Sequence, residues 1–193
     1  MTNPAPSPRL RRIAAGVWGG FMLARGREDG MAVVDTSPEG AWASFAAMWI
    51  CAPAFLALHL LVGQEGGLGL RAFAAQAVGY VIDWFAFPLL MWGVMEQMGR
   101  RRNFPAFVAA WNWSTVPQVL AAMAAAAIGA LPGVPAAVGV LLGLAALAYA
   151  VWVAWFVAKT ALDVPGARAG FVVGAGVMLG LFIDGLALTI GAG

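Results

Sequence analysis

The chain has 193 residues, of which 62% are apolar and only 10% are charged, and its formal net charge is +2. Soluble domains carry about 25% charged residues, so this chain has too few charges to cover a water-facing surface. The composition excludes an ordinary soluble domain and predicts an all-α protein that crosses a membrane several times. One cysteine and one histidine do not make a conventional metal site, so neither a metal nor a cofactor is expected.

Two segments are predicted ahead of the membrane domain. Residues 1–8 are rich in proline and predict a flexible tail. In residues 9–36, apolar side chains recur at helical spacing between groups of arginines. This pattern predicts a cytoplasmic amphipathic helix in the membrane interface, with Arg9, Arg11 and Arg12 near anionic lipid headgroups. The alternative is a positively charged flank that only sets the topology of the first span.

Residues 37–193 form the predicted membrane domain, which begins where Ser37 can cap a helix and Pro38 suits its first turn. A membrane-spanning helix needs about 20 predominantly apolar residues. Five stretches meet this length, at residues 41–62, 72–97, 105–129, 136–158 and 169–190. The linkers between them are short and contain glycine and proline, so neighbouring spans are expected to run antiparallel. The predicted fold is a bundle of five transmembrane helices.

The basic residues are distributed unevenly over the predicted loops. With the N-terminus in the cytoplasm, ten of the eleven Lys and Arg residues lie inside, namely Arg9, Arg11, Arg12, Arg25, Arg27, Arg100, Arg101, Arg102, Lys159 and Arg168. Only Arg71 lies outside. Because cytoplasmic loops carry the excess of Lys and Arg, this distribution predicts a cytoplasmic N-terminus and an external C-terminus.

The second span contains a carboxylate within the apolar segment YVIDWFAFPLLMW, residues 80–92. Insertion scales put the cost of an aspartate at the centre of a membrane helix at about 2.5–3.5 kcal/mol, so Asp83 is expected to face the bundle. Gln76, Tyr80 and Asp83 lie at i, i+4 and i+7 and therefore share one helix face. Pro88 follows five residues later and predicts a kink.

The third span contains candidate partners for Asp83 in the segment AWNWSTVPQ, residues 110–118. The amide of Asn112 and the hydroxyl of Thr115 are possible donors, and Gln118 lies nearest to the depth of Asp83. This requires that the second and third spans pack together. Two interpretations follow. The favoured one makes Asp83 a hydrogen-bonded peg between helices, and the alternative makes it a proton or substrate contact in a transport path.

Two more polar residues lie near the outer ends of their spans. Asp184 extends a row formed by Gly176 and Gly180 at a spacing of four. A similar row of small residues in the fourth span predicts that the fourth and fifth spans pack tightly. His59 in the first span lies at a depth comparable to Asp184. It is either half of a proton relay with Asp184 or a histidine that snorkels toward the interface.

The run Arg100, Arg101 and Arg102 follows the second span. It is either a contact for lipid phosphate or an acidic partner, or a charge that sets topology. No nucleophile, metalloprotease, phosphate-loop or dinucleotide motif is found, so the chain is not expected to be an enzyme. The basic residues do not form a stripe with interleaved aromatics, so no nucleic-acid partner is expected.

Five closely spaced spans, very short loops, a cytoplasmic N-terminal segment and an external C-terminus resemble the Yip (Ypt-interacting) family of small membrane proteins. The segments YVIDWFAFPLLMW, AFVAAWNWSTVPQ and WFVAKTAL are also similar to alphaproteobacterial inner-membrane proteins. The resemblance implies a multi-pass protein of the bacterial inner membrane with a membrane-organising or accessory role. Its expected partners are the lipid bilayer and a membrane protein or a second copy of the chain. The alternative function is a small transporter or proton-coupled permeation protein that uses Asp83.

Overall fold

The computed structural model describes residues 7–62 and 69–192, and the side chains of residues 58–62 and of residue 192 lie outside this description. Every regular element in the described ranges is helical. The elements in chain order are α1 (Pro8–Leu23), α2 (Gly30–Val33), α3 (Pro38–Ser44), α4 (Ala46–Val62), α5 (Leu70–Gln97), the 3-10 turn η1 (Arg101–Asn103), α6 (Phe104–Gly129), α7 (Ala136–Leu162) and α8 (Gly166–Ala192).

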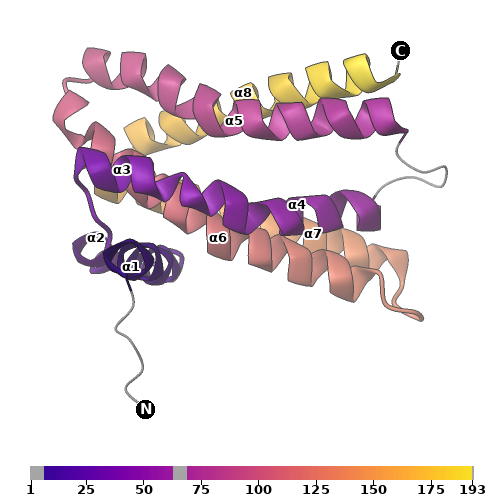
Figure 1. Ribbon diagram of the computed structural model, residues 1–193. Coiled ribbons are helices and arrows are strands. Elements are labelled where there is room, and N and C mark those ends of the chain that lie inside the picture. The colour runs from indigo at the N-terminus through magenta and orange to yellow at the C-terminus, as the bar shows by residue number, and fades with distance from the viewer. Residues whose placement is uncertain (1–6, 63–68, 193) are drawn as a thin grey trace.

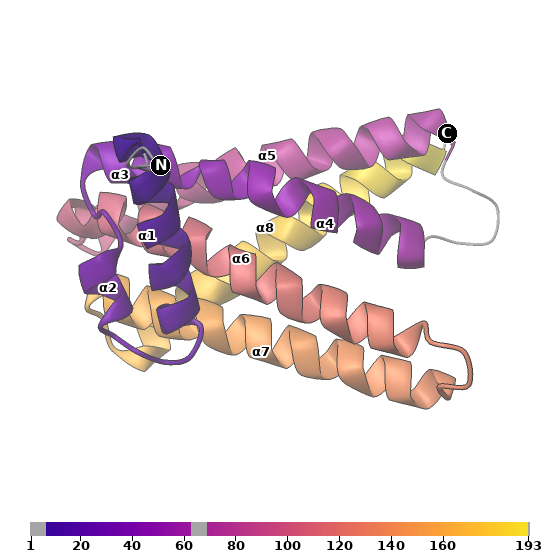
Figure 2. The same cartoon turned by 60° about the horizontal axis from the view of Figure 1, so that its bottom comes forward.

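The long helices are arranged as two pairs, with α4 alongside. Figure 1 shows α5 beside α8, and Figure 2 shows α6 beside α7 with α4 next to them. The sequence analysis expected α7 with α8 and α5 with α6, and both expectations were wrong about the main partner. Glycines explain the observed pairs. A Cβ at Gly129 of α6 would lie 3.0 Å from Cα of Gly139 in α7, and one at Gly191 of α8 would lie 3.0 Å from Cα of Ala72 in α5.

Four helical segments in the described part of the chain are both long and apolar enough to cross a membrane. They are Pro38–Ala57, which combines α3 with most of α4, then Leu70–Gln97, Ala136–Leu162 and Gly166–Gly191. The predicted count of five was therefore wrong. The third predicted span, α6, has sufficient length with 26 residues but carries the polar segment from Asn112 to Gln118. Protein surrounds this part of α6, since α1, α3, α4 and α7 all contact the helix, so it is not an apolar surface facing lipid.

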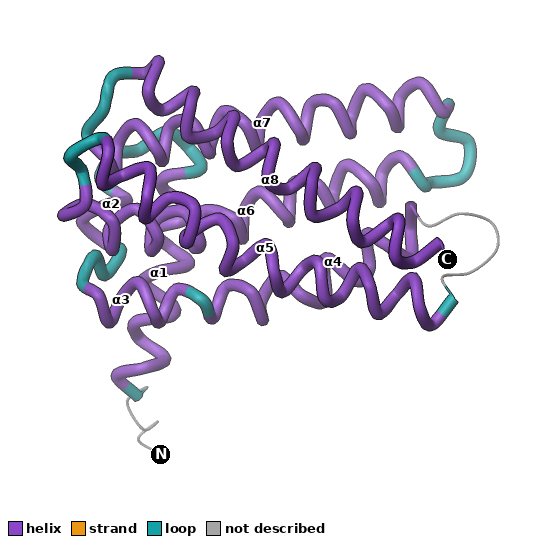
Figure 3. The backbone as a smooth tube through the Cα atoms, turned by 90° about the horizontal axis from the view of Figure 1, so that it is seen from above, coloured by secondary structure: helices purple, strands orange, loops and turns teal. Residues whose placement is uncertain are grey.

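The ends of the helices separate the charges. Figures 1 and 3 show that the last turns of α5 and α7 and the first turns of α6 and α8 lie at the same end as α1, α2 and α3. These elements and their connections carry ten of the eleven Lys and Arg residues, and this end is called the basic end below. Arg71 lies in the first turn of α5 at the opposite end, where its Nε donates to the carbonyl oxygen of Ile190 at 2.9 Å.

Helix α1 crosses the basic end and packs against α6. A Cβ at Gly16 would overlap the indole ring of Trp113, and a Cβ at Gly20 would overlap the backbone carbonyl of the same residue. Pro117 lies four residues after Trp113 and has no N–H to donate to this carbonyl, so α1 docks where the hydrogen-bond ladder of α6 is interrupted. The segment is helical as predicted, with glycines supplying its closest contacts, and its place in the membrane interface stays a prediction.

The helix start at Ser37 and Pro38 is observed where the sequence predicts it. Ser37 is the N-cap of α3, and its side-chain oxygen accepts a hydrogen bond from the Gly40 N–H at 3.0 Å. Pro38 begins the helix, and Glu39 lies in the first turn, where a carboxylate is favoured by the helix dipole. This cap fixes where the chain leaves α1 and α2 and enters the bundle.

Candidate functional site

A cavity of about 330 Å³ lies between α4, α5, α6 and α8. Its polar lining consists of Tyr80, Asp83, Asn112, Thr115 and Asp184, and its apolar lining includes Cys51, Phe55, Trp84, Phe87 and Trp111. The two intramembrane carboxylates, which are 101 positions apart in the sequence, thus line one cavity because α8 packs beside α5. The structure therefore brings together five of the eight polar residues singled out in the sequence.

The two carboxylates have no polar partner among the described residues. Neither Asp83 nor Asp184 makes a hydrogen bond or an ion pair with any side chain or backbone group in the described ranges. Gly180, one turn before Asp184, also lines the cavity, and a Cβ placed there would meet no atom within 4 Å. The predicted close-packing row is therefore only partly realised, because a Cβ at Gly176 would lie 2.9 Å from the ring of Phe87, whereas Gly180 faces the cavity.

Asn112 has a different partner from the one expected. Its side chain is 2% exposed, and its Nδ2 donates to Oγ of Ser44 at 2.9 Å. The Ser44 hydroxyl in turn donates to the carbonyl oxygen of Ala41 at 2.6 Å. The expected bond from Asn112 to Asp83 is therefore not made, because α6 lies closer to α3 and α4 than to α5. Asn112 joins α6 to the junction of α3 and α4.

The other polar groups of α6 bond to their own helix. The Thr115 hydroxyl donates to the carbonyl of Trp111 at 3.1 Å, so it does not donate to Asp83. Gln118 donates from Nε2 to the carbonyl of Ser114 at 2.9 Å and does not line the cavity. Such bonds back to the preceding turn satisfy a polar side chain without help from another helix.

Tyr80 joins α5 to α4 at the edge of the cavity. Its hydroxyl donates to the carbonyl oxygen of Met48 at 2.6 Å, and its ring lies 4.3 Å from that of Phe55, centroid to centroid. Tyr80 and Asp83 line the cavity together, as their shared helix face predicts, whereas Gln76 does not line it. The side chain of His59 lies outside the described residues, so its pairing with Asp184 stays a prediction.

Sequence reasoning missed Ser44, which accepts the hydrogen bond from Asn112 although 68 positions separate them. It also missed Cys51 as part of the cavity wall. No local pattern marks either residue. The spacing of Gly176, Gly180 and Asp184 was a signal for the α8 wall, but it was interpreted as a packing row.

Four of the nine arginines at the basic end pair with carboxylates, namely Arg12, Arg27, Arg100 and Arg101. Arg12 Nε lies 2.9 Å from Oδ2 of Asp35, Arg101 Nη1 lies 2.9 Å from Oε1 of Glu96, and Arg100 Nη1 lies 3.5 Å from Oδ2 of Asp163. The pKa of Asp35 is lowered, mainly because its carboxylate accepts hydrogen bonds from the side chain and backbone N–H of Ser37, with a smaller contribution from Arg12. Arg102 has no ion-pair partner among the described residues.

Comparison with known protein families identifies the family of this chain. The model of the Yip1 domain matches residues 27–188. The chain belongs to the Yip1 domain family. The comparisons with curated proteins and with solved structures gave no significant match. The predicted resemblance to the Yip family is thereby confirmed.

The Yip1 match covers α4, α5, α6, α7 and most of α8, and it includes every residue of the cavity. It begins at Arg27, so α1 lies before the matched region and packs against α6 within it. The protein is thus a Yip1-family membrane protein whose apolar helices contact the lipid bilayer.

Proposed function

We propose that this Yip1-domain protein is a non-enzymatic organising protein of the bacterial inner membrane. It acts through contacts with lipids and with the helices of a partner or of a second copy, and its basic end faces the cytoplasm. Membership in a family not known for enzymes supports the absence of catalysis.

The observation that carries this proposal is the concentration of ten of eleven Lys and Arg residues at one end of the bundle. Anionic lipids of the cytoplasmic leaflet attract such residues by about 1 kcal/mol for each Lys or Arg near the surface. Helix α1 fits the same surface, because Arg9 and Arg11 are exposed and the side chains of Leu10 and Trp18 are each 57% exposed. A helix with arginines and exposed apolar side chains is suited to the membrane interface.

The proposed orientation is tested by labelling single cysteines in intact cells with a membrane-impermeant thiol reagent. In a Cys51→Ala background, Leu131→Cys reports the end opposite to the basic end, and Arg168→Cys reports the basic end. We expect Leu131→Cys to react in intact cells and Arg168→Cys to react only after the membrane is opened. The reverse labelling pattern would refute the proposed orientation.

The proposed lipid contact is tested in vesicles that contain a mixture of phosphatidylglycerol and phosphatidylcholine. The lipids that surround the purified protein should be enriched in phosphatidylglycerol, and the enrichment should fall as salt is raised, because salt screens exposed charges. Equal amounts of the two lipids around the protein at low salt would contradict a role based on the anionic leaflet.

A second candidate function is proton or cation permeation through the cavity. It is favoured by the shared placement of Asp83 and Asp184, neither of which has a partner among the described residues. Intramembrane carboxylates that face a cavity mark many ion pathways. In reconstituted vesicles Asp83→Asn should abolish the flux, whereas Asp163→Asn, a change of an exposed carboxylate outside the cavity, should preserve it. A wild-type flux no greater than that of empty vesicles rejects this function.

A further inference from the structure

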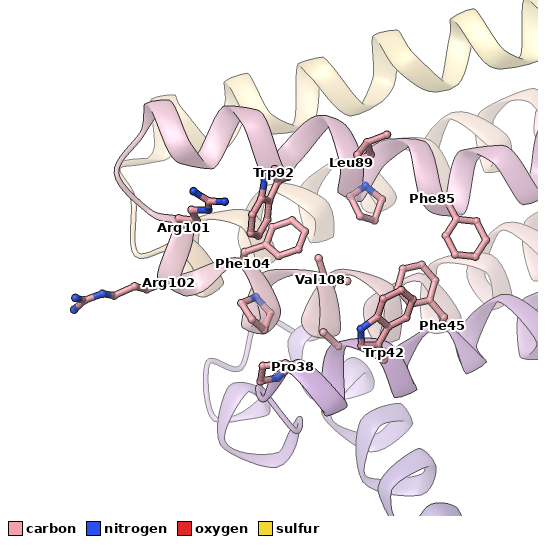
Figure 4. Close-up of a pocket in the computed structure, with 13 residues that line it drawn as sticks. Pro38, Trp42, Phe45, Phe85, Leu89, Trp92, Arg101, Arg102, Phe104 and Val108 are labelled. Atoms are coloured by element: carbon pink, nitrogen blue, oxygen red, sulfur yellow. The ribbon is translucent and has the colours of Figure 1, made fainter.

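An apolar groove of about 720 Å³ opens between α3, α5 and α6 at the basic end of the bundle. Figure 4 shows its walls, which include Trp42, Phe45, Phe85, Leu89, Trp92 and Phe104. The volume lies within the range of about 300–1,000 Å³ that is usual for sites of small ligands. The groove is distinct from the carboxylate cavity, and among the described residues the two share only Pro88 of α5.

Two aromatic pairs hold the walls of the groove together. The rings of Phe45 and Phe85 are stacked with their centroids 5.0 Å apart, and those of Trp92 and Phe104 meet edge to face at 4.9 Å. Figure 4 shows these pairs at opposite ends of the groove. Each pair joins α5 to a different neighbour, so the space between them is bounded by three parts of the chain.

Two arginines line the end of the groove that lies next to the Trp92–Phe104 pair. The guanidinium of Arg101 lies 4.1 Å from the centroid of the Trp92 ring and also pairs with Glu96. Arg102 has no carboxylate partner among the described residues, and in Figure 4 its side chain extends away from the helices. The groove therefore combines an apolar interior with a cation that is available to an anion outside.

The groove lies within the depth of one leaflet of a bilayer. On α5 its lining runs from Phe85 to Trp92, over which the helix rises about 10 Å. One leaflet occupies about 15 Å, half of a hydrocarbon core of about 30 Å. A partner helix that crosses the membrane would need a groove along the whole of α5. A lipid of a single leaflet needs a groove only in the half of the bilayer at the basic end.

We propose that the groove binds an anionic phospholipid of the leaflet at the basic end. One acyl chain lies between the two aromatic pairs, and the phosphate contacts Arg102, with Arg101 next to it on Trp92. This inference rests on the proposed function for its orientation, because only the leaflet at the basic end can supply the lipid. It adds one defined lipid-binding site to the general attraction of the basic end for anionic lipids.

The site is tested by native mass spectrometry of the full chain in neutral detergent, titrated with phosphatidylglycerol or phosphatidylcholine. We expect the wild-type protein to retain one phosphatidylglycerol at least fivefold more tightly than phosphatidylcholine. Arg102→Ala should weaken phosphatidylglycerol about fivefold, which corresponds to about 1 kcal/mol. Arg168→Ala, which removes an exposed arginine at the same end but outside the groove, is the matched control and should change binding less than twofold.

A second variant tests the apolar part of the site. Ala41 lines the groove, so Ala41→Phe should fill it and weaken both lipids together, provided that thermal unfolding shows an intact fold. Inorganic phosphate alone should not displace the phospholipid, because it has no acyl chain to occupy the groove.

The outcomes separate this site from the proposed function. If Arg102→Ala and Arg168→Ala weaken binding equally, or if a folded Ala41→Phe variant binds as the wild type does, the groove is not the site. The general preference for anionic lipid would then still stand. If the wild-type protein shows no preference for phosphatidylglycerol in vesicles or in detergent, both the proposed function and the groove site fail.

Discussion

Two regions of the molecule place glycines beside polar residues. One is the contact between α1 and α6, and the other is the stretch of α8 at Gly180 and Asp184 that lines the cavity. They differ in what covers the polar residues. At the first contact, Gly16 and Gly20 leave no room for a Cβ, and the nearby Asn112 is buried and hydrogen-bonded. At the second, Gly180 faces open space, and the carboxylate of Asp184 has no partner among the described residues.

The difference teaches how to interpret small and polar residues inside a membrane protein. Where another helix covers them, they set the fold, and substitution should lower the free energy of unfolding. Where a cavity adjoins them, they contribute little to stability and remain available to water, an ion or a ligand. The following variants test this division, beginning with the one expected to have the largest effect.

Gly20→Val should lower the free energy of unfolding by about 3 kcal/mol, because overpacking at a tight contact forces the backbone or neighbouring groups to move. The added side chain would overlap the carbonyl of Trp113. The matched control is Gly174→Val in α8, where a Cβ would meet no atom within 4 Å. Thermal unfolding in detergent measures both variants, and equal losses would show that α1 is not tightly docked on α6.

Asn112→Ala should cost about 2 kcal/mol, because removing one partner of a buried hydrogen bond leaves the other unsatisfied. The double variant with Ser44→Ala should lose less than the sum of the two single losses, since the pair share one bond. A double-mutant cycle from chemical or thermal unfolding gives this difference. Strict additivity would mean that the bond does not contribute to stability.

Asp35 should make a smaller, pH-dependent contribution of about 0.5 kcal/mol, the size usual for exposed ion pairs. Because its pKa is lowered in the folded state, the stabilisation is present above the pKa of the unfolded chain and is lost as pH falls through the folded pKa. Melting temperatures of the wild type and of Asp35→Asn should therefore converge as the pH falls below about 4. A difference that is constant from pH 6 to pH 3 would exclude this carboxylate as the cause.

Asp83→Leu should change the stability by less than about 0.5 kcal/mol or raise it, because the carboxylate has no partner among the described residues to lose. The favoured interpretation from the sequence, a hydrogen-bonded peg, predicts the opposite result. Thermal unfolding of Asp83→Leu beside Asp83→Asn distinguishes them. If Asp83→Leu alone lowered the free energy of unfolding by more than about 1 kcal/mol, the interpretation of Asp83 as a hydrogen-bonded peg would be supported instead.

The long apolar helices were predictable from the sequence because length and composition are local properties. The expected span at 72–97 corresponds to Leu70–Gln97, and those at 136–158 and 169–190 correspond to Ala136–Leu162 and Gly166–Ala192. For α6 the same reasoning failed. Its length suggested a span, but the polar segment from Asn112 to Gln118 makes it less apolar than the other four candidates.

The partners of each helix could not be predicted. A row of small residues shows that a backbone can be approached, but it carries no information about which helix approaches. Gly139 illustrates this, because it contacts Gly129 of α6 and not the α8 helix that was expected. The polar residues could be singled out in the sequence because charge within an apolar run is a local signal. Their contacts depended on the pairing and were therefore missed.

The pairing of α5 with α8 also has a consequence for biosynthesis. A ribosome makes α5 first, and α6 and α7 must follow before α8 exists. At about 5–20 residues per second this interval is on the order of ten seconds. During that time the glycine face of α5 at Gly79, which later packs against Ile183 and Ala187, has only lipid or the insertion machinery to cover it. A chain that ends prematurely after α7 would keep that face uncovered, and the bonding of Arg71 to Ile190 would mark the moment when assembly is complete.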